Sequence, residues 1–148
     1  MLTGRFGNTS GRPYIEGRLS LPNLNLSANV SFVIDTGSDC TVLMPLDAMR
    51  INLDYSRLTK EVDSVGIGGI CRDFAEPALV AFTDGIAVYI YEIELRIATA
   101  SADIMAIPSL LGRDVINRWH ISYSFPNNKI EIQNHTADNI VSIDHPEP

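Results

Sequence analysis

The most constraining feature of the sequence is an aspartate that directly follows an apolar segment and opens a tight turn. Residues 30–34 are mostly apolar, Asp35-Thr36-Gly37 follows them, and residues 40–44 are again rich in strand-forming side chains. Short apolar segments bounded by Asp and Gly are typical of buried strands joined by turns. Gly37 allows an unusual backbone angle and close approach by a ligand. Taken alone, the Asp35 carboxylate could equally cap backbone N–H groups of an ordinary turn.

The rest of the chain also has the pattern of strands. We expect strands at residues 14–21, 30–34, 40–44, 78–82, 86–97, 120–125 and 129–133. Charged and aliphatic side chains alternate over residues 92–97, which is typical of a strand with one buried face. Short helices are expected at residues 45–50 and 114–119, the second of them capped by Asp114. The predicted fold class is therefore mainly β with short connecting helices.

The C-terminal part of the chain predicts a hairpin. Pro126-Asn127-Asn128 separates two expected strands, and Asn tolerates the left-handed backbone of tight turns. Residues 140–143 are mostly apolar and could form a short strand or belong to a tail.

The length of the chain is usual for one domain. We expect a single domain over residues 1–148, with a core at about 12–133 and a C-terminal strand or tail at 134–148.

Composition and charge argue against several classes of protein. The net charge of −7 disfavours nucleic acid as a partner, because phosphates require a basic surface. Charged residues interrupt the apolar segment 78–98, so no membrane-spanning helix is expected. No signal peptide is recognisable at the N-terminus, which predicts a cytoplasmic location. Cys40 and Cys71 are too few for a disulfide scaffold or a zinc site, and we expect neither a metal nor an organic cofactor.

A second motif, Leu110-Leu111-Gly112, precedes the expected helix near the C-terminus. Together with the Asp-Thr-Gly-Ser motif at residues 35–38, it resembles the retropepsin-like aspartic peptidases, a family that includes viral proteases and the DNA-damage-inducible proteins. The resemblance extends over residues from about 12 to 133. It implies a single-lobe acid-protease fold that assembles as a homodimer.

The resemblance also implies a role for each motif. Asp35 is expected to be the catalytic residue, with Thr36 and Gly37 supporting it. The Leu-Leu-Gly motif is expected to cross behind this catalytic loop. Arg113 is expected to bind Asp39 through two parallel hydrogen bonds and so to fix the loop. Two separate solvated charges are the alternative for that pair.

The glycine-rich residues 64–71 do not form the Gly-x-Gly-x-x-Gly fingerprint of dinucleotide binding. The resemblance makes them a flap that closes over an extended polypeptide substrate. An ordinary glycine-containing hairpin is the alternative. The residues expected to line the substrate groove are Gly37, Asp39, Ile67, Gly68 and Gly69.

The catalytic motif occurs once in the chain, whereas aspartic catalysis needs two carboxyl groups close together. The expected function is therefore that of a homodimeric aspartic endopeptidase, in which Asp35 of both subunits activates one water molecule. A catalytically silent peptide-binding or dimerisation module with the same fold is the alternative function. Ser38 replaces the alanine common in viral members, and an extra hydrogen bond from Ser38 would lower the proton affinity of the carboxyl pair.

Overall fold

The computed structural model describes residues 1–66 and 69–143 and consists mainly of strands. The strands are β1 (Leu2–Thr3), β2 (Arg5–Phe6), β3 (Pro13–Leu21), β4 (Leu26–Ile34), β5 (Val42–Leu43), β6 (Lys60–Gly66), β7 (Gly69–Thr83), β8 (Ala87–Ala98), β9 (Leu110–Leu111), β10 (Trp119–Ser124), β11 (Lys129–Asn134) and β12 (Asn139–Ser142). The helices are α1 (Pro45–Arg50) and α2 (Arg113–Ile116), with short 3₁₀ turns η1 (Pro22–Leu24), η2 (Tyr55–Arg57) and η3 (Ala102–Ile104). The predicted mainly β class with short connecting helices is confirmed.

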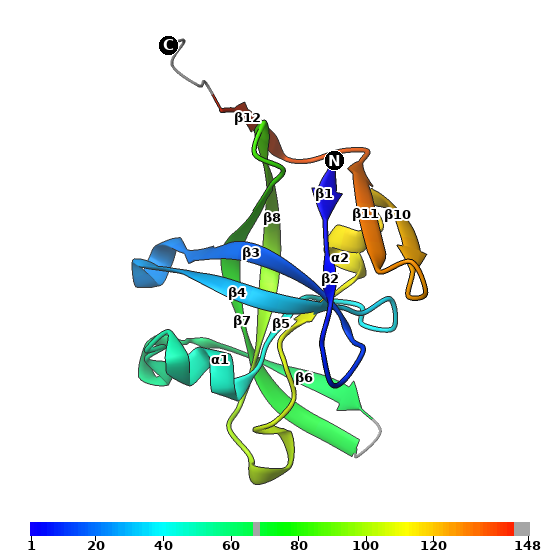
Figure 1. The fold of residues 1–148 in the computed structure, drawn as a ribbon. Helices are drawn as coiled ribbons and strands as arrows, with labels where there is room; N and C mark the ends of the chain where they lie inside the picture. Colours follow the sequence, from blue (N-terminus) through cyan, green and yellow to red (C-terminus); the bar gives the residue numbers. More distant parts are fainter. Residues whose placement is uncertain (67–68, 144–148) are drawn as a thin grey trace.

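The larger sheet closes on itself as a barrel (Figure 1). β8 pairs with β5, β5 with β9, β9 with β4, β4 with β3 and β3 with β7, and the ring closes where β7 pairs with β8. The antiparallel register of β7 and β8 runs from Asp73 opposite Ala98 to Thr83 opposite Val88. Closure of a sheet removes its free edges and places alternate side chains of each strand inside.

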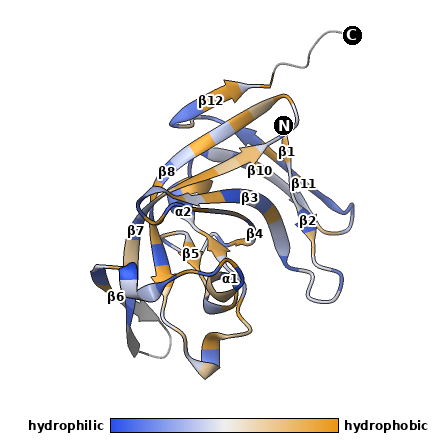
Figure 2. Cartoon of the chain, turned by 90° about the vertical axis from the view of Figure 1, so that its left-hand side faces the viewer, coloured by the Kyte–Doolittle hydropathy of each residue, from blue (hydrophilic) through white to orange (hydrophobic). Residues whose placement is uncertain are grey.

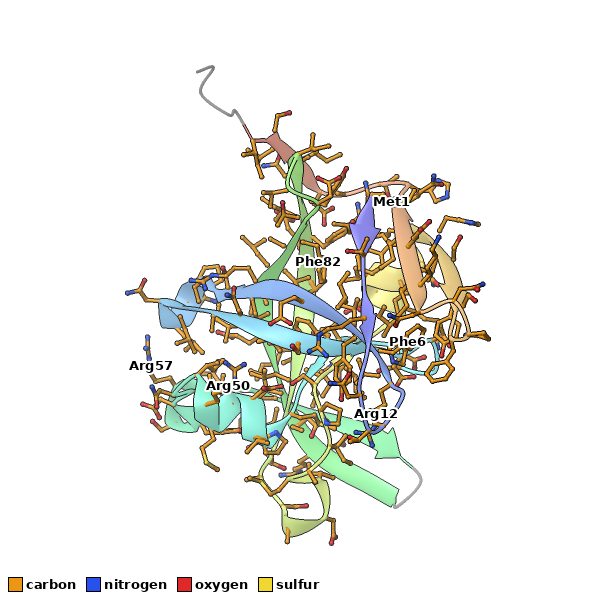
Figure 3. All side chains as sticks on the ribbon, in the orientation of Figure 1. Met1, Phe6, Arg12, Arg50, Arg57 and Phe82 are labelled. Carbon is orange, nitrogen blue, oxygen red and sulfur yellow. The ribbon has the colours of Figure 1, made fainter. Side chains whose placement is uncertain are left out.

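The inside of the barrel is apolar because the strands alternate in character. Figure 2 shows hydrophobic and hydrophilic bands along β8. Phe82 of β7, labelled in Figure 3, is buried, and its ring centroid lies 5.1 Å from that of Trp119 in β10. Trp119 Nε1 donates a hydrogen bond to the hydroxyl of Tyr91 in β8 over 2.6 Å. This buried aromatic cluster holds β10 against the barrel.

A second sheet consists of β1, β11 and β10, in that order. The β10–β11 hairpin lies where the sequence predicted it, and Asn128 in its turn has a φ of 52°, the left-handed conformation expected for Asn. β1 pairs with β11, with Leu2 opposite Ile132. The sequence did not predict β1, because a strand of two residues is too short to show an alternating pattern.

The C-terminal segment forms a strand along the barrel. β12 pairs with β8 in an antiparallel manner, with Asn139 opposite Ile90 and Ser142 opposite Ala87. This pairing decides between the strand and the tail that the sequence left open, although all side chains of β12 are exposed.

Several predicted boundaries differ from the observed ones. The strand expected at residues 40–44 is reduced to β5, and the helix expected at 114–119 is reduced to α2. The strand expected at 78–82 is instead the end of β7, which begins at Gly69. Partners from distant segments set these limits, and local sequence patterns do not contain that information.

Candidate active site

Asp35 lies at the end of β4, where two segments far apart in the sequence meet. β4 and β9 pair in parallel, with Ile34 opposite Leu111. The Asp35 N–H extends this pairing by donating to the Leu111 carbonyl over 3.0 Å. The Asp35 carbonyl accepts the N–H of Ser38 at 3.1 Å, which closes the turn. The backbone of Asp35 is therefore held both by its own turn and by β9.

The Asp35 carboxylate is half-buried, and its two oxygens have different surroundings. Oδ1 accepts the N–H of Gly37 at 2.9 Å. Oδ2 forms no hydrogen bond with residues 1–66 or 69–143. One oxygen thus fixes the orientation of the carboxylate, and the other is available for proton exchange with water or with a second carboxyl group.

Gly37 is needed in this turn for space rather than for an unusual backbone angle. Positive φ values among the described glycines occur at Gly11 and Gly85, so Gly37 does not use the unusual backbone angle that glycine allows there. A Cβ atom on Gly37 would lie 3.2 Å from Asp35 Oδ1, which is closer than ordinary van der Waals contact. Glycine therefore allows the carboxylate to fold back onto the turn.

β9 and Gly112 lie directly behind residues 35–40, which we call the Asp35 loop. β9 is inserted between β4 and β5. A Cβ atom on Gly112 would lie 2.3 Å from the carbonyl carbon of Cys40, a separation that no side chain tolerates. The N–H of Arg113 donates to the Ser38 carbonyl over 2.8 Å. The Leu110-Leu111-Gly112 motif therefore supports the Asp35 loop from behind.

Arg113 joins two points of the Asp35 loop. Its Nη1 donates to the Thr36 carbonyl over 2.7 Å, and its Nη2 donates to the carboxylate of Asp39. The sequence predicted that both guanidinium nitrogens bind Asp39, but the structure divides them between a backbone and a carboxylate acceptor. The Asp39 side chain is 83% exposed, and exposed ion pairs contribute little stability. The bond to the Thr36 carbonyl therefore matters more for the position of the loop.

A buried pair that the sequence did not reveal holds the end of the loop. Thr41 is fully buried, and its N–H and hydroxyl donate to the two carboxylate oxygens of Asp114 over 2.9 and 2.7 Å. The Thr41 hydroxyl oxygen also accepts the N–H of Gly112 at 3.2 Å.

The Thr41–Asp114 pair overturns the expected role of Asp114 as a helix cap. α2 begins at Arg113, and Gly112 stands at its N-cap position without a side-chain cap. The two partners are 73 residues apart, so no local pattern connects them. An aspartate directly after the Leu-Leu-Gly-Arg segment is the sole feature of the sequence that could have pointed to the Thr41–Asp114 pair.

The Ser38 hydroxyl binds the backbone of Cys40 rather than the Asp35 carboxylate. The Ser38 hydroxyl donates to the Cys40 carbonyl over 2.6 Å, so its single proton is not directed at Asp35. The extra hydrogen bond expected from the Ser38 hydroxyl to the Asp35 carboxyl is therefore not formed. The Cys40 thiol is free and half-buried, and burial raises its pKa while the charge of Arg96 opposes that rise.

A groove of about 490 Å³ lies beside the Asp35 loop. Its walls are formed by residues 37–40 of the loop, Val42 of β5, Asp63 of β6 and Arg96 of β8. The groove therefore includes Gly37 and Asp39, two of the residues expected to contact substrate.

One further expected substrate residue, Gly69, belongs to β7, which pairs with β6. The hairpin register runs from Lys60 opposite Ala75 to Gly66 opposite Gly69. Gly69 is thus the first residue of β7. Ile67 and Gly68 lie outside the described residues.

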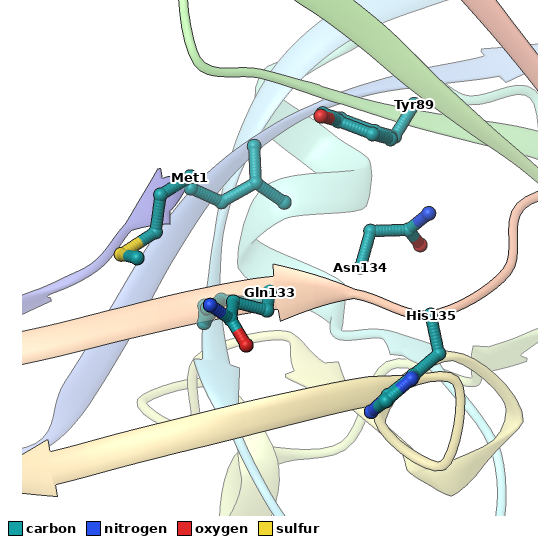
Figure 4. Close-up of a pocket in the computed structure, with 7 residues that line it drawn as sticks. Met1, Tyr89, Gln133, Asn134 and His135 are labelled. Carbon is teal, nitrogen blue, oxygen red and sulfur yellow. The ribbon is translucent and has the colours of Figure 1, made fainter.

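A second cavity, of about 420 Å³, lies beside the N-terminal strand and is drawn in Figure 4. Met1, Tyr89, Gln133, Asn134 and His135 are among its lining residues. It contains no residue of the Asp35 loop and no carboxylate. The groove beside Asp35, rather than this cavity, is therefore the candidate active site.

The described part of the chain has neither a metal-binding cluster nor a membrane-spanning helix. Residues 1–66 and 69–143 contain no cluster of three or more His, Cys, Asp or Glu side chains that could hold a metal ion. Within the same ranges, every helix is too short or too polar to cross a membrane.

Comparison with known proteins identifies the fold. The sequence matches no protein-family model and no curated protein. Among solved structures it is similar to a retropepsin-like aspartic protease from Rickettsia conorii, with a TM-score of 0.53 and 19% identity, over 88% of this chain and 96% of that chain. It is also similar to EIAV protease complexed with the inhibitor HBY-793, with a TM-score of 0.49 and 18% identity, over 75% of this chain and 90% of that chain. The chain has the retropepsin-like fold, as its two motifs predicted.

Proposed function

We propose that two copies of this chain form an aspartic endopeptidase with one active site. The observation that carries the proposal is the Asp35 carboxylate, which is oriented by the Gly37 N–H and leaves Oδ2 without a partner among the described residues. The retropepsin-like fold and the groove beside residues 37–40 support it. Asp35, Thr36 and Gly37 are the proposed catalytic residues, and Leu110, Leu111, Gly112 and Arg113 are the proposed support.

The chemistry requires two aspartates because neighbouring carboxyl groups share a proton and take different tasks. The ionised Asp35 of one copy accepts a proton from a water molecule, and the oxygen of that water forms a bond to the peptide carbonyl carbon. The protonated Asp35 of the other copy donates its proton to the carbonyl oxygen. The C–N bond then breaks as the first Asp35 passes the proton it took from water to the leaving nitrogen, while the second Asp35 takes a proton back from a hydroxyl of the tetrahedral intermediate. No covalent enzyme intermediate forms.

The face that carries the Asp35 loop also has features of a dimer interface. The Asp35 loop, between β4 and β5, and the turn of the β10–β11 hairpin project toward the same side of the barrel (Figure 1). Tyr123 and Phe125 are each 57% exposed, and the ring of Phe6 lies 5.1 Å from both of their rings, centroid to centroid. Exposed clustered aromatic side chains are typical of association sites. Among the described strands β10 pairs with β11 alone, and a second β10 could pair with its other edge.

The substrate in this proposal is an extended polypeptide. Gly37 and Asp39 on the loop side, with Ile67, Gly68 and Gly69 on the hairpin side, are the proposed contacts. An extended peptide can add its backbone to exposed strand and loop groups, and such contacts recognise length and conformation more than sequence.

The proposal is tested by measuring proteolysis and oligomeric state together. The wild-type protein should cleave an unfolded protein substrate at some pH between about 4 and 7, in the range where carboxyl pairs act, and a statine-type transition-state mimic should inhibit it. Activity per chain should fall on dilution in step with the dimer fraction from sedimentation. A strictly monomeric protein, or equal cleavage by wild type and Asp35→Asn, would overturn the proposal. A dimer that cleaves nothing would instead be the catalytically silent peptide-binding module.

A further inference from the structure

Arg96 of β8 lines the groove beside the Asp35 loop. Arg96 lies opposite Val42 of β5 in a parallel strand pair, and Val42 lies two positions after Cys40. The Arg96 N–H donates to the Thr41 carbonyl over 3.0 Å, which fixes its backbone next to the loop. β8 pairs with both β5 and β7 in the barrel, so the backbone at Arg96 is held on both sides.

The guanidinium of Arg96 has no partner in the described part of the protein. Its Nε is buried and forms no hydrogen bond there, and no ion pair or side-chain hydrogen bond of Arg96 occurs among residues 1–66 and 69–143. A buried donor without an acceptor is unfavourable, because it has lost water and gained nothing. A ligand that supplied an acceptor would recover this loss.

The acidic residues near the groove are already engaged with other groups. The Asp39 carboxylate binds Arg113, and Asp63 lies 3.9 Å from Arg72. Glu94 forms an ion pair with Lys60 at 3.1 Å.

The buried carboxylate below the loop is also engaged, because both oxygens of Asp114 accept hydrogen bonds from Thr41. Arg96 is therefore the cation of this groove that lacks an acidic partner among the described residues.

We propose that Arg96 forms a subsite for an acidic side chain of the polypeptide in the groove beside the Asp35 loop. This inference rests on the proposed function and adds a substrate preference to it. A guanidinium binds a carboxylate through two parallel hydrogen bonds, which an amide of the same shape cannot match. Residues 37–40 and Arg96 line the same groove, so a peptide bound along residues 37–40 would bring a Glu or Asp side chain at one fixed position within reach of Arg96.

Binding to the Asp35→Asn variant tests the inference without requiring cleavage. The probes are peptides in which a single Glu is moved along an otherwise neutral sequence, and a matched series that carries Gln. One Glu position should bind roughly tenfold more tightly than its Gln counterpart, as expected for a charge-assisted pair. Adding Arg96→Leu should remove this difference, and Arg96→Lys should restore part of it.

The control is Arg18→Gln, which removes an exposed arginine of β3 that does not line the groove. This variant should keep the Glu preference. The preference should also weaken below about pH 4, where the Glu side chain of the peptide becomes protonated while arginine stays charged. Equal binding of both series, or no binding of either, would overturn the inference. Failure of the wild type to cleave a bound peptide would instead count against the proposed function.

Discussion

Two turns of this protein begin with an aspartate that follows a strand, Asp35 after β4 and Asp84 after β7. Both carboxylates accept the N–H of the residue two positions later at 2.9 Å, from Gly37 in one turn and from Ile86 in the other. Beyond this shared bond, the two turns differ in what the second oxygen does.

The Asp84 carboxylate is fully engaged. Its Oδ1 also accepts the N–H of Ala87 at 2.9 Å, and its Oδ2 binds the amino group of Met1 at 2.8 Å. The Met1 amino group, followed by the Ala87 and Ile86 N–H groups, holds the pKa of Asp84 well below its usual range. The side chain is 5% exposed. Asp84 is therefore a structural anion, whereas one oxygen of Asp35 has no partner among the described residues. The proposed catalytic role of Asp35 requires this difference.

The largest expected effect that tests this comparison is on catalysis. Asp35→Asn should lower kcat/KM for peptide cleavage by at least about 10³-fold, because the amide can neither accept the proton of water nor share one with its counterpart. Its free energy of unfolding should stay close to that of wild type, since Asn keeps the oxygen that accepts the Gly37 N–H. Asp84→Asn is the matched control and should retain activity. Loss of activity in both variants would remove the distinction between the two turns.

The second effect concerns the glycines that the two turns depend on. Gly112→Ala should destabilise the protein by about 3 kcal/mol or more, because the new Cβ would lie 2.3 Å from the Cys40 carbonyl carbon and the backbone must move. Gly85→Ala should cost only about 1 kcal/mol, which reflects its positive φ of 87° with open space around it. Urea denaturation at one protein concentration measures both. Equal losses would show that the Asp35 loop is not packed against Gly112 as tightly as described.

The third effect concerns the support of the Asp35 loop from a distant segment. Arg113→Leu removes the bonds to the Thr36 carbonyl and to Asp39, and it should lower kcat/KM roughly tenfold by loosening the loop. Asp39→Asn leaves the Thr36 bond intact and should have a smaller effect. Steady-state kinetics on one peptide substrate compares them. A larger loss in Asp39→Asn would mean that the carboxylate, rather than the backbone bond, positions the loop.

The smallest effect is the pH dependence of stability at Asp84. The pKa of Asp84 is lower in the folded state than in the unfolded state. The Asp84 carboxylate therefore contributes fully to the free energy of unfolding above the unfolded-state pKa of about 4, and this contribution is lost as the pH falls through the folded-state pKa. The free energy of unfolding of wild type should exceed that of Asp84→Asn by roughly 1 kcal/mol at neutral pH, which is the scale of a hydrogen bond to a charged group. The gap should narrow below about pH 4. A gap that is constant from neutral to acidic pH would show that Asp84 is not the titrating group.

Part of the fold and part of the site could be predicted because their signals are local. Alternation over residues 92–97 identified β8, and the turn residues around Asn128 identified the β10–β11 hairpin. Asp35 and the Leu-Leu-Gly motif were recognisable because each is a short continuous segment.

The sequence by itself determined the residue types that the chemistry needs and the strands that carry them, because side-chain periodicity is a property of neighbouring residues. Only the tertiary structure decided which groups have partners. It joined Thr41 to Asp114 across 73 residues, engaged both oxygens of Asp84 but one of Asp35, and left Arg96 without an acceptor among the described residues. Such outcomes depend on barrel closure, which brings distant strands together in a register that no local pattern contains.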